Sequence, residues 1–116
     1  MSAASFIPYA RQYIDDDDIA AVNAVLRSSF IARGPGAAAF ERALCDLVGA
    51  PHAVACASGT AGLHIACIAA GIQPGDEVIT SPVTFVASAN CAVYCGATPV
   101  FADIDPKTIA IEPEEI

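Results

Sequence analysis

Hydrophobic residues recur every three or four positions after the aspartate run at residues 15–18. This spacing is that of one face of a helix, and its apolar positions are Ile19, Val22, Val25 and Leu26. Asp15 or Asp16 can cap such a helix, and the remaining carboxylates then lie in its positive first turn. The pattern therefore predicts a helix that begins at the aspartate run and continues to Ser28.

A second helix is predicted after a glycine and proline cluster. Gly34-Pro35-Gly36 interrupts the apolar pattern and predicts a loop over residues 31–36. Apolar residues then return at helical spacing, at Phe40, Leu44, Leu47 and Val48. Gly49 follows and is a typical helix terminator.

From residue 51 the pattern changes to short apolar runs that alternate with helical segments. The predicted order is a strand at 52–57, a helix at 60–70, a strand at 77–80, a helix at about 85–95 and a strand at 99–104. Gly71 and Gly96 follow the two helices. Strands and helices that alternate with short connections indicate the α/β class and a mainly parallel sheet.

Composition limits the classes of partner. The chain has 116 residues, enough for one domain, and 55% of them are hydrophobic against 16% charged. Because the mean hydropathy is +0.55, we expect further sequence or a second subunit to cover part of the apolar surface. The net charge of −8 disfavours nucleic acid and anionic membranes as partners. No apolar run of transmembrane length and no signal peptide is evident, so the expected location is cytoplasmic.

Five cysteines make an odd count in a chain that carries no export signal. This count argues against a disulfide framework. Cys91 and Cys95 stand four apart, and His64 and Cys67 three apart, but no standard zinc spacing completes a ligand set. We expect free thiols and no bound metal.

Two loops, residues 57–62 and 80–85, connect a predicted strand to a predicted helix. Ser58-Gly59-Thr60 offers two hydroxyls and a small residue at a helix N-terminus, where the backbone favours an anion such as phosphate. The alternative is that Ser58 or Thr60 merely caps the helix. Phe85 could stack on a flat ligand, or it could belong to the core. Neither a Walker loop nor a dinucleotide fingerprint occurs.

Several segments together resemble the DegT/DnrJ/StrS family of pyridoxal-phosphate (PLP)-dependent sugar-nucleotide aminotransferases, over about residues 6–112. They are Ile7-Pro8-Tyr9, Gly34-Pro35 with Phe40-Glu41, Ser58-Gly59-Thr60-Ala61, residues 74–79, residues 84–90, and residues 96–101 with Asp103-Ile104-Asp105. The start of the chain and residues 88–96 look most similar to enzymes that aminate a UDP-linked 4-keto sugar on the way to pseudaminic acid.

The resemblance implies part of the large domain of a fold type I transferase, a three-layer α/β/α structure that works as a homodimer. Residues 1–50 would form an N-terminal helical segment and residues 51–116 the start of the sheet. Ser58, Gly59 and Thr60 would hold the PLP phosphate, and Phe85 would stack on its ring. The residues that would contact a nucleotide-sugar substrate are Tyr9, Ser29, Phe30, Ile31, Ala32 and Arg33. Glutamate would be the amino donor.

One departure from the family pattern concerns lysine. A transaminase needs a lysine that binds PLP covalently, but Lys107 is the single lysine here and lies in a polar turn. The family places its lysine beyond this length, so we expect an N-terminal part that is inactive alone. Two alternatives stay open: a dehydratase of the same family, in which histidine replaces that lysine, and a non-catalytic α/β module that binds a phosphorylated metabolite.

Overall fold

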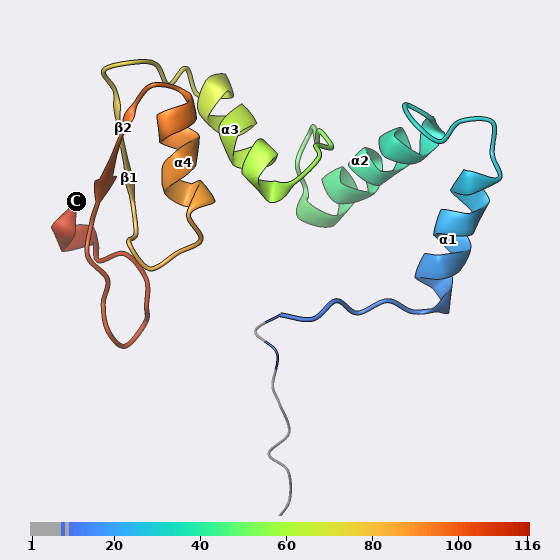
Figure 1. Ribbon diagram of the computed structural model, residues 1–116, viewed down its shortest axis with the longest axis horizontal. Coiled ribbons are helices and arrows are strands. Elements are labelled where there is room, and N and C mark those ends of the chain that lie inside the picture. The colour runs from blue at the N-terminus through green and yellow to red at the C-terminus, as the bar shows by residue number, and fades with distance from the viewer. Residues whose placement is uncertain (1–7, 9) are drawn as a thin grey trace, which may run out of the picture. The chain divides into compact units, whose positions relative to one another are not determined.

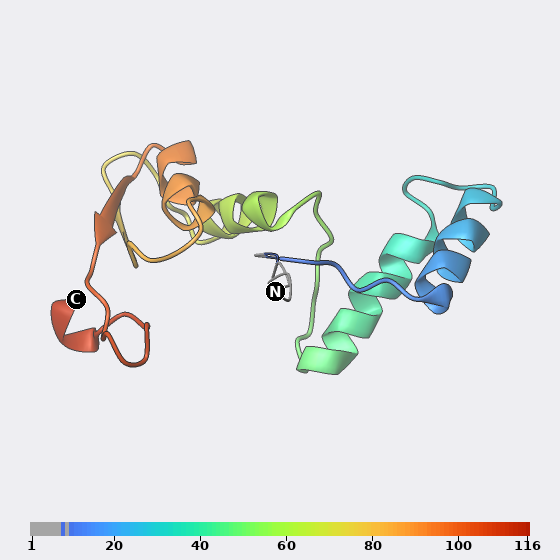
Figure 2. The ribbon, with the colours of Figure 1, turned by 60° about the horizontal axis from the view of Figure 1, so that its bottom comes forward.

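Two units make up the chain in the computed structural model, which describes residues 8 and 10–116. The first unit ends at Ala55 and the second begins at Cys56 (Figures 1 and 2). None of the helices in the described residues is long and apolar enough to cross a membrane.

Helix α1 (Asp16–Leu26) confirms the helix predicted from the aspartate run, but it ends at Leu26 rather than at Ser28. Asp15 is the N-cap, and its Oδ1 accepts the N–H groups of Asp17 and Asp18 at 3.0 and 3.1 Å. Asp18 Oδ2 in turn accepts the N–H of Asp15 at 3.1 Å, which completes a capping box. The carboxylate run thus satisfies the free donors of a helix start.

Helix α2 (Pro35–Val48) begins inside the segment predicted as a loop, so the loop is shorter than expected. Gly34 is the N-cap and Pro35 occupies the first turn, where its missing N–H costs nothing. Gly49 ends the helix in the left-handed conformation with φ 69°, as predicted.

The predicted strand at residues 52–57 is wrong, because the structure assigns no strand there. The N–H of Ala55 donates to Oε1 of Glu41 on α2 at 2.9 Å instead of to a neighbouring strand. Val54 remains 78% exposed. An apolar run becomes a strand only when another strand pairs with it, and no described residue of the first unit supplies one.

The second unit holds α3 (Gly59–Ala69), β1 (Glu77–Thr80), α4 (Ala87–Tyr94), β2 (Thr98–Phe101) and a short 3-10 helix, η1 (Pro113–Glu115). The two strands are parallel, with Glu77 opposite Thr98 and Thr80 opposite Phe101. Helix α4 packs on both strands and on α3 (Figure 1). The described residues therefore form helices and a two-stranded parallel sheet, one strand fewer than predicted.

Two boundaries in this unit differ from the prediction by two residues or more. The helix expected from residue 85 begins at Ala87, because Phe85 and Val86 form its preceding turn and the Phe85 carbonyl accepts the N–H of Ser88 at 3.0 Å. The last strand ends at Phe101, and Ile104 instead forms an isolated antiparallel bridge with Ile111.

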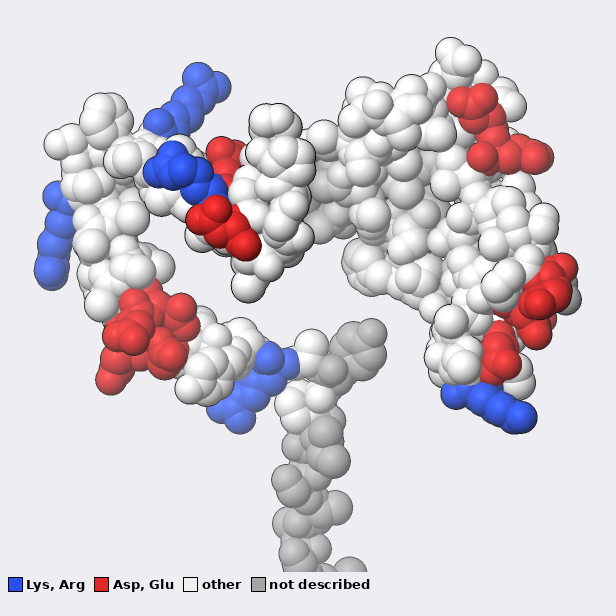
Figure 3. Space-filling view, turned by 180° about the vertical axis from the view of Figure 1, so that it is seen from behind, with Lys and Arg blue, Asp and Glu red and all other residues white. Residues whose placement is uncertain are grey.

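Small residues make up the core of the described chain: Ala87, Cys91, Ala92, Ala97 and Ala102. Many large apolar side chains stay exposed, among them Phe40, Leu47 and Phe85. Much of the face in Figure 3 accordingly carries neither acidic nor basic side chains. Such a surface is typical of a chain whose apolar residues pack against further protein.

Candidate cofactor site

The start of α3 leaves two backbone donors free. Ser58 is the N-cap, with its Oγ accepting the N–H of Ala61 at 3.2 Å and its carbonyl accepting that of Gly62 at 2.9 Å. The N–H groups of Gly59 and Thr60 have no acceptor among the described residues. Free amides at a helix N-terminus, together with the helix dipole, favour an anion there.

Capping and anion binding are compatible at Ser58. The hydroxyl oxygen accepts the Ala61 N–H, while the hydroxyl hydrogen stays available for a second partner. The sequence alternative that Ser58 caps the helix is therefore confirmed, whereas Thr60 is not the cap.

Access to these amides is open. A Cβ built at Gly59 would meet no atom within 4 Å, so a ligand can approach the backbone closely. Ser58 and Gly59 are exposed and Thr60 is half-buried. These features fit a phosphate group, which needs several donors on one side and room on the other.

Phe85 lies in the loop between β1 and α4 and is 73% exposed. It does not belong to the core of the described residues, contrary to one of the two sequence alternatives. The turn around it is ordered by the Ser88 N–H on its carbonyl and by a hydrogen bond of 3.1 Å between Thr84 Oγ1 and Ser88 Oγ. The ring is thus presented outward on a fixed turn.

The two candidate loops lie at the same end of the second unit. Parallel strands end at one edge of the sheet, and the chain turns there from β1 into α4. In Figure 1 the N-terminal ends of α3 and α4 and the carboxyl ends of both strands face the same side. Because α3 packs against α4, the Ser58 loop belongs to the edge where α/β proteins bind ligands.

The predicted substrate residues belong to the first unit. Tyr9 lies outside the described residues. Ser29, Phe30, Ile31, Ala32 and Arg33 are all exposed between α1 and α2. Ser28 Oγ accepts the Phe30 N–H at 3.3 Å, and Arg33 has a positive φ of 53°. Arg33 is thus exposed on the turn between the two helices.

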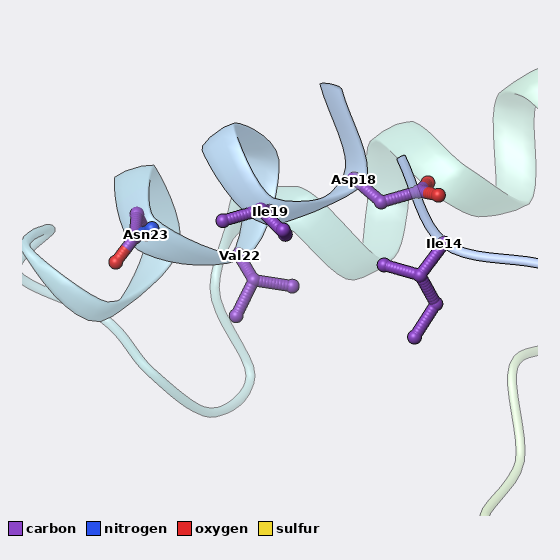
Figure 4. A pocket seen from close by; sticks show the side chains of 5 residues that line it. All are labelled: Ile14, Asp18, Ile19, Val22 and Asn23. Carbon is purple, nitrogen blue, oxygen red and sulfur yellow. The ribbon is translucent and has the colours of Figure 1, made fainter. Parts of the chain in front are cut away.

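A shallow hollow on α1 was not predicted as a site. It is lined by Ile14, Asp18, Ile19, Val22 and Asn23 (Figure 4). Its one carboxylate belongs to Asp18 and already accepts the Asp15 N–H. The hollow is therefore an apolar face of the helix and offers no group suited to catalysis.

Lys107 lies in the polar turn that the sequence predicted. The carboxylate of Asp105 accepts the N–H groups of Thr108 and Lys107, and these hydrogen bonds lower the pKa of Asp105 below its ordinary value. Lys107 itself is exposed. Within the described residues no group of three or more His, Cys, Asp or Glu side chains could hold a metal ion.

Taken together, the parallel strands and the free amides at their carboxyl edge define an α/β protein that can bind a phosphorylated ligand. The model of the DegT/DnrJ/EryC1/StrS aminotransferase family matches residues 12–116. The chain belongs to this family.

Relatives agree with the assignment. The spore coat polysaccharide biosynthesis protein SpsC of Bacillus subtilis is 48% identical over 111 residues, which cover 96% of this chain and 28% of SpsC. Spr1654 of Streptococcus pneumoniae, described as a sugar aminotransferase, superposes in its PLP form with a TM-score of 0.87 at 34% identity, over 94% of this chain and 28% of that one. PseC of Helicobacter pylori, an aminotransferase of pseudaminic acid biosynthesis, gives 0.78 at 37% identity, over 84% and 27%.

The chain thus spans little more than a quarter of the length of these relatives. It forms part of the family fold, and homologues in the family bind PLP or its aminated form, PMP.

Proposed function

We propose that this chain is the N-terminal part of the large domain of a PLP-dependent aminotransferase of fold type I, with residues 1–50 as a helical segment and residues 51–116 as the start of a three-layer α/β/α sheet. The whole protein transfers an amino group from glutamate to a nucleotide-linked 4-keto-6-deoxy sugar. The observation that carries the proposal is the pair of free amides at Gly59 and Thr60 on the N-terminus of α3.

The residues at this helix start suit the phosphate of PLP. The N–H groups of Gly59 and Thr60 and the hydroxyl hydrogen of Ser58 would donate to phosphate oxygens, and the dipole of α3 would stabilise their charge. Phe85 would offer its exposed ring for stacking on the pyridine ring. When bound, PLP supplies the electron sink that lets an amino group leave one carbon and enter another.

The residues proposed to bind the substrate belong to the first unit. Arg33 offers a charge for a nucleotide diphosphate in a chain whose net charge of −8 gives no general attraction for an anion. Tyr9 and residues 29–32 contact the rest of the substrate. The enzyme is a cytoplasmic homodimer, and the precursor of pseudaminic acid is the substrate expected from sequence.

Activity tests use the whole protein, of which this chain is the proposed N-terminal part, together with PLP. Glutamate alone should convert bound PLP to PMP, seen as a change of absorption spectrum, and a nucleotide-linked 4-keto sugar should reverse the change. Arg33→Ala should raise KM for the sugar nucleotide and leave the glutamate half-reaction unchanged, because glutamate does not reach the nucleotide pocket. Arg27→Ala is the control, because Arg27 is the C-cap of α1 and lies just before the same loop.

Three results would contradict the proposal. Efficient amination of ordinary 2-oxo acids with no reaction of nucleotide sugars would remove the sugar assignment. Loss of water from the sugar without transfer of nitrogen would favour the dehydratase. Binding of a phosphorylated metabolite with neither reaction would favour the non-catalytic module.

Removing the exposed ring tests the role of Phe85. Phe85→Ala in the whole protein should weaken PLP retention by about 5- to 150-fold, because stacking of a flat ring on an aromatic side chain contributes about 1–3 kcal/mol. Val83→Ala is the matched control, since Val83 lies in the same loop and is 56% exposed. Equal PLP affinity in both variants, measured by equilibrium dialysis, would show that the ring has no part in the site.

A further inference from the structure

The hydroxyl of Ser28 links the end of α1 to the turn that follows it. Its oxygen lies 2.8 Å from the Val25 carbonyl oxygen, in the last turn of α1, and 3.0 Å from the Phe30 carbonyl oxygen. The single hydroxyl hydrogen is therefore shared between these two acceptors. The same hydroxyl oxygen accepts the N–H of Phe30 at 3.3 Å. Ser28 thus contacts both backbone polar groups of Phe30 and ties this residue to the helix.

A close backbone approach holds the turn from its other end. Gly34 is the N-cap of α2, and a Cβ built there would lie 2.8 Å from the Cβ of Phe30 and 3.2 Å from its carbonyl oxygen. A change of side-chain rotamer moves neither of these atoms, so it could not make room. Since the φ of Gly34 is −88°, which other residues also adopt, glycine is required here by space and not by backbone angle. Phe30 is thereby held between Ser28 and Gly34.

Arg33, inside this turn, has a φ of 53°. The left-handed conformation is unfavourable for residues other than glycine, and it persists where surrounding contacts fix the backbone. The contacts that Ser28 and Gly34 make with Phe30 fix the turn in this way. They set the backbone from which the exposed Arg33 side chain extends.

We propose that Ser28 is a positioning residue which, with the bare backbone of Gly34, preorganises the turn at residues 29–33 so that Arg33 can bind the diphosphate of a nucleotide sugar. This inference rests on the proposed function, because that function assigns Arg33 to the substrate. Ser28 acts through the turn and not by touching the substrate. A turn that is fixed before binding loses less conformational entropy when the substrate arrives, so affinity increases without a new contact.

Ser28→Ala in the whole protein removes the hydrogen bonds of the hydroxyl. We expect KM for a UDP-linked 4-keto sugar to rise about 2- to 10-fold, as the loss of an ordinary hydrogen bond predicts. The conversion of PLP to PMP by glutamate should stay unchanged, because glutamate does not reach the nucleotide pocket, and kcat should also stay unchanged. Ser28→Thr keeps the hydroxyl and should restore the wild-type KM.

Gly34→Ala tests the other end of the turn. The new Cβ would displace Phe30, so we expect KM for the sugar nucleotide to rise at least as much as in Ser28→Ala. Gly36→Ala is the matched control, because Gly36 lies two residues further on, in the first turn of α2, and a Cβ there meets no atom within 4 Å. This control should keep the wild-type KM.

A double variant distinguishes positioning from a purely structural role. If Ser28 acts through Arg33, Ser28→Ala should change KM little in a protein that already carries Arg33→Ala. Equal increases of KM in the two backgrounds, an unchanged KM in Ser28→Ala, or slower PMP formation from glutamate in that variant would overturn the inference and leave the proposed function intact. If the wild-type protein reacts with no nucleotide sugar, the proposed function is wrong and the inference fails with it.

Discussion

Gly59→Asp is expected to weaken PLP retention by about 100-fold or more without destabilising α3. The new carboxylate would stand at the two free amides, where the proposal places the phosphate of PLP. Two unit charges 4 Å apart near a protein surface repel by about 4 kcal/mol, and part of that is screened where the site is open to water. The loss should therefore exceed that from removing one hydrogen bond.

The substitution separates binding from folding because the position tolerates a side chain. A Cβ at Gly59 meets no atom within 4 Å, and its backbone is not in the left-handed region. An aspartate in the first turn also interacts favourably with the helix dipole, by about 0.3–1 kcal/mol. Thermal unfolding of the PLP-free protein should thus be unchanged or shift slightly upward.

Gly59→Asn is the matched control, since its side chain has nearly the same shape and no charge. We expect it to retain PLP far better than Gly59→Asp in equilibrium dialysis, with Gly59→Ala nearest to wild type. If the Asp and Asn variants bind PLP equally well, no phosphate sits at the start of α3, and the cofactor assignment of Ser58, Gly59 and Thr60 is wrong.

Local signals explain why most helices could be predicted from sequence. Asp15 and Gly49 each satisfy the backbone groups of their own helix end, so a few neighbouring residues suffice to identify them. Strand β1 was predicted with its observed bounds because a turn precedes it and four extended residues fill it. These features depend on residues that are close in the sequence.

Features that depend on distant partners could not be predicted in this way. Residues 52–57 have the composition of a strand, yet Ala55 donates to Glu41 and no strand pairs with the segment. Periodicity placed Cys67 and Cys91 on two helices, but only the structure shows that these helices, α3 and α4, pack against each other. The free amides of Gly59 and Thr60 became evident only once Ser58 was seen to cap α3.

Gly96→Ala is expected to destabilise the fold by about 2–4 kcal/mol, for two reasons that add. Gly96 follows α4 with φ 77°, a conformation that costs an L-residue about 1–2 kcal/mol. A Cβ there would also lie 2.9 Å from Cγ of Pro74, and a proline ring cannot turn away as a flexible side chain can.

This contact lies where the two strands begin. Pro74 belongs to the turn before β1, Gly96 precedes β2, and the N–H of Thr98 donates to the Asp76 carbonyl at 2.9 Å. Pushing Pro74 away from Gly96 should therefore strain the first hydrogen bond between the strands as well as the turn.

Gly71→Ala isolates the conformational part of this cost. Gly71 follows α3 with φ 80°, but a Cβ there meets no atom within 4 Å, so only about 1–2 kcal/mol should be lost. Urea unfolding of the whole protein measures the free energy of unfolding of both variants. Equal losses would mean that the close approach of Pro74 to Gly96 does not contribute to stability; a clearly larger loss at Gly96 would mean that this contact maintains the alignment of β1 and β2.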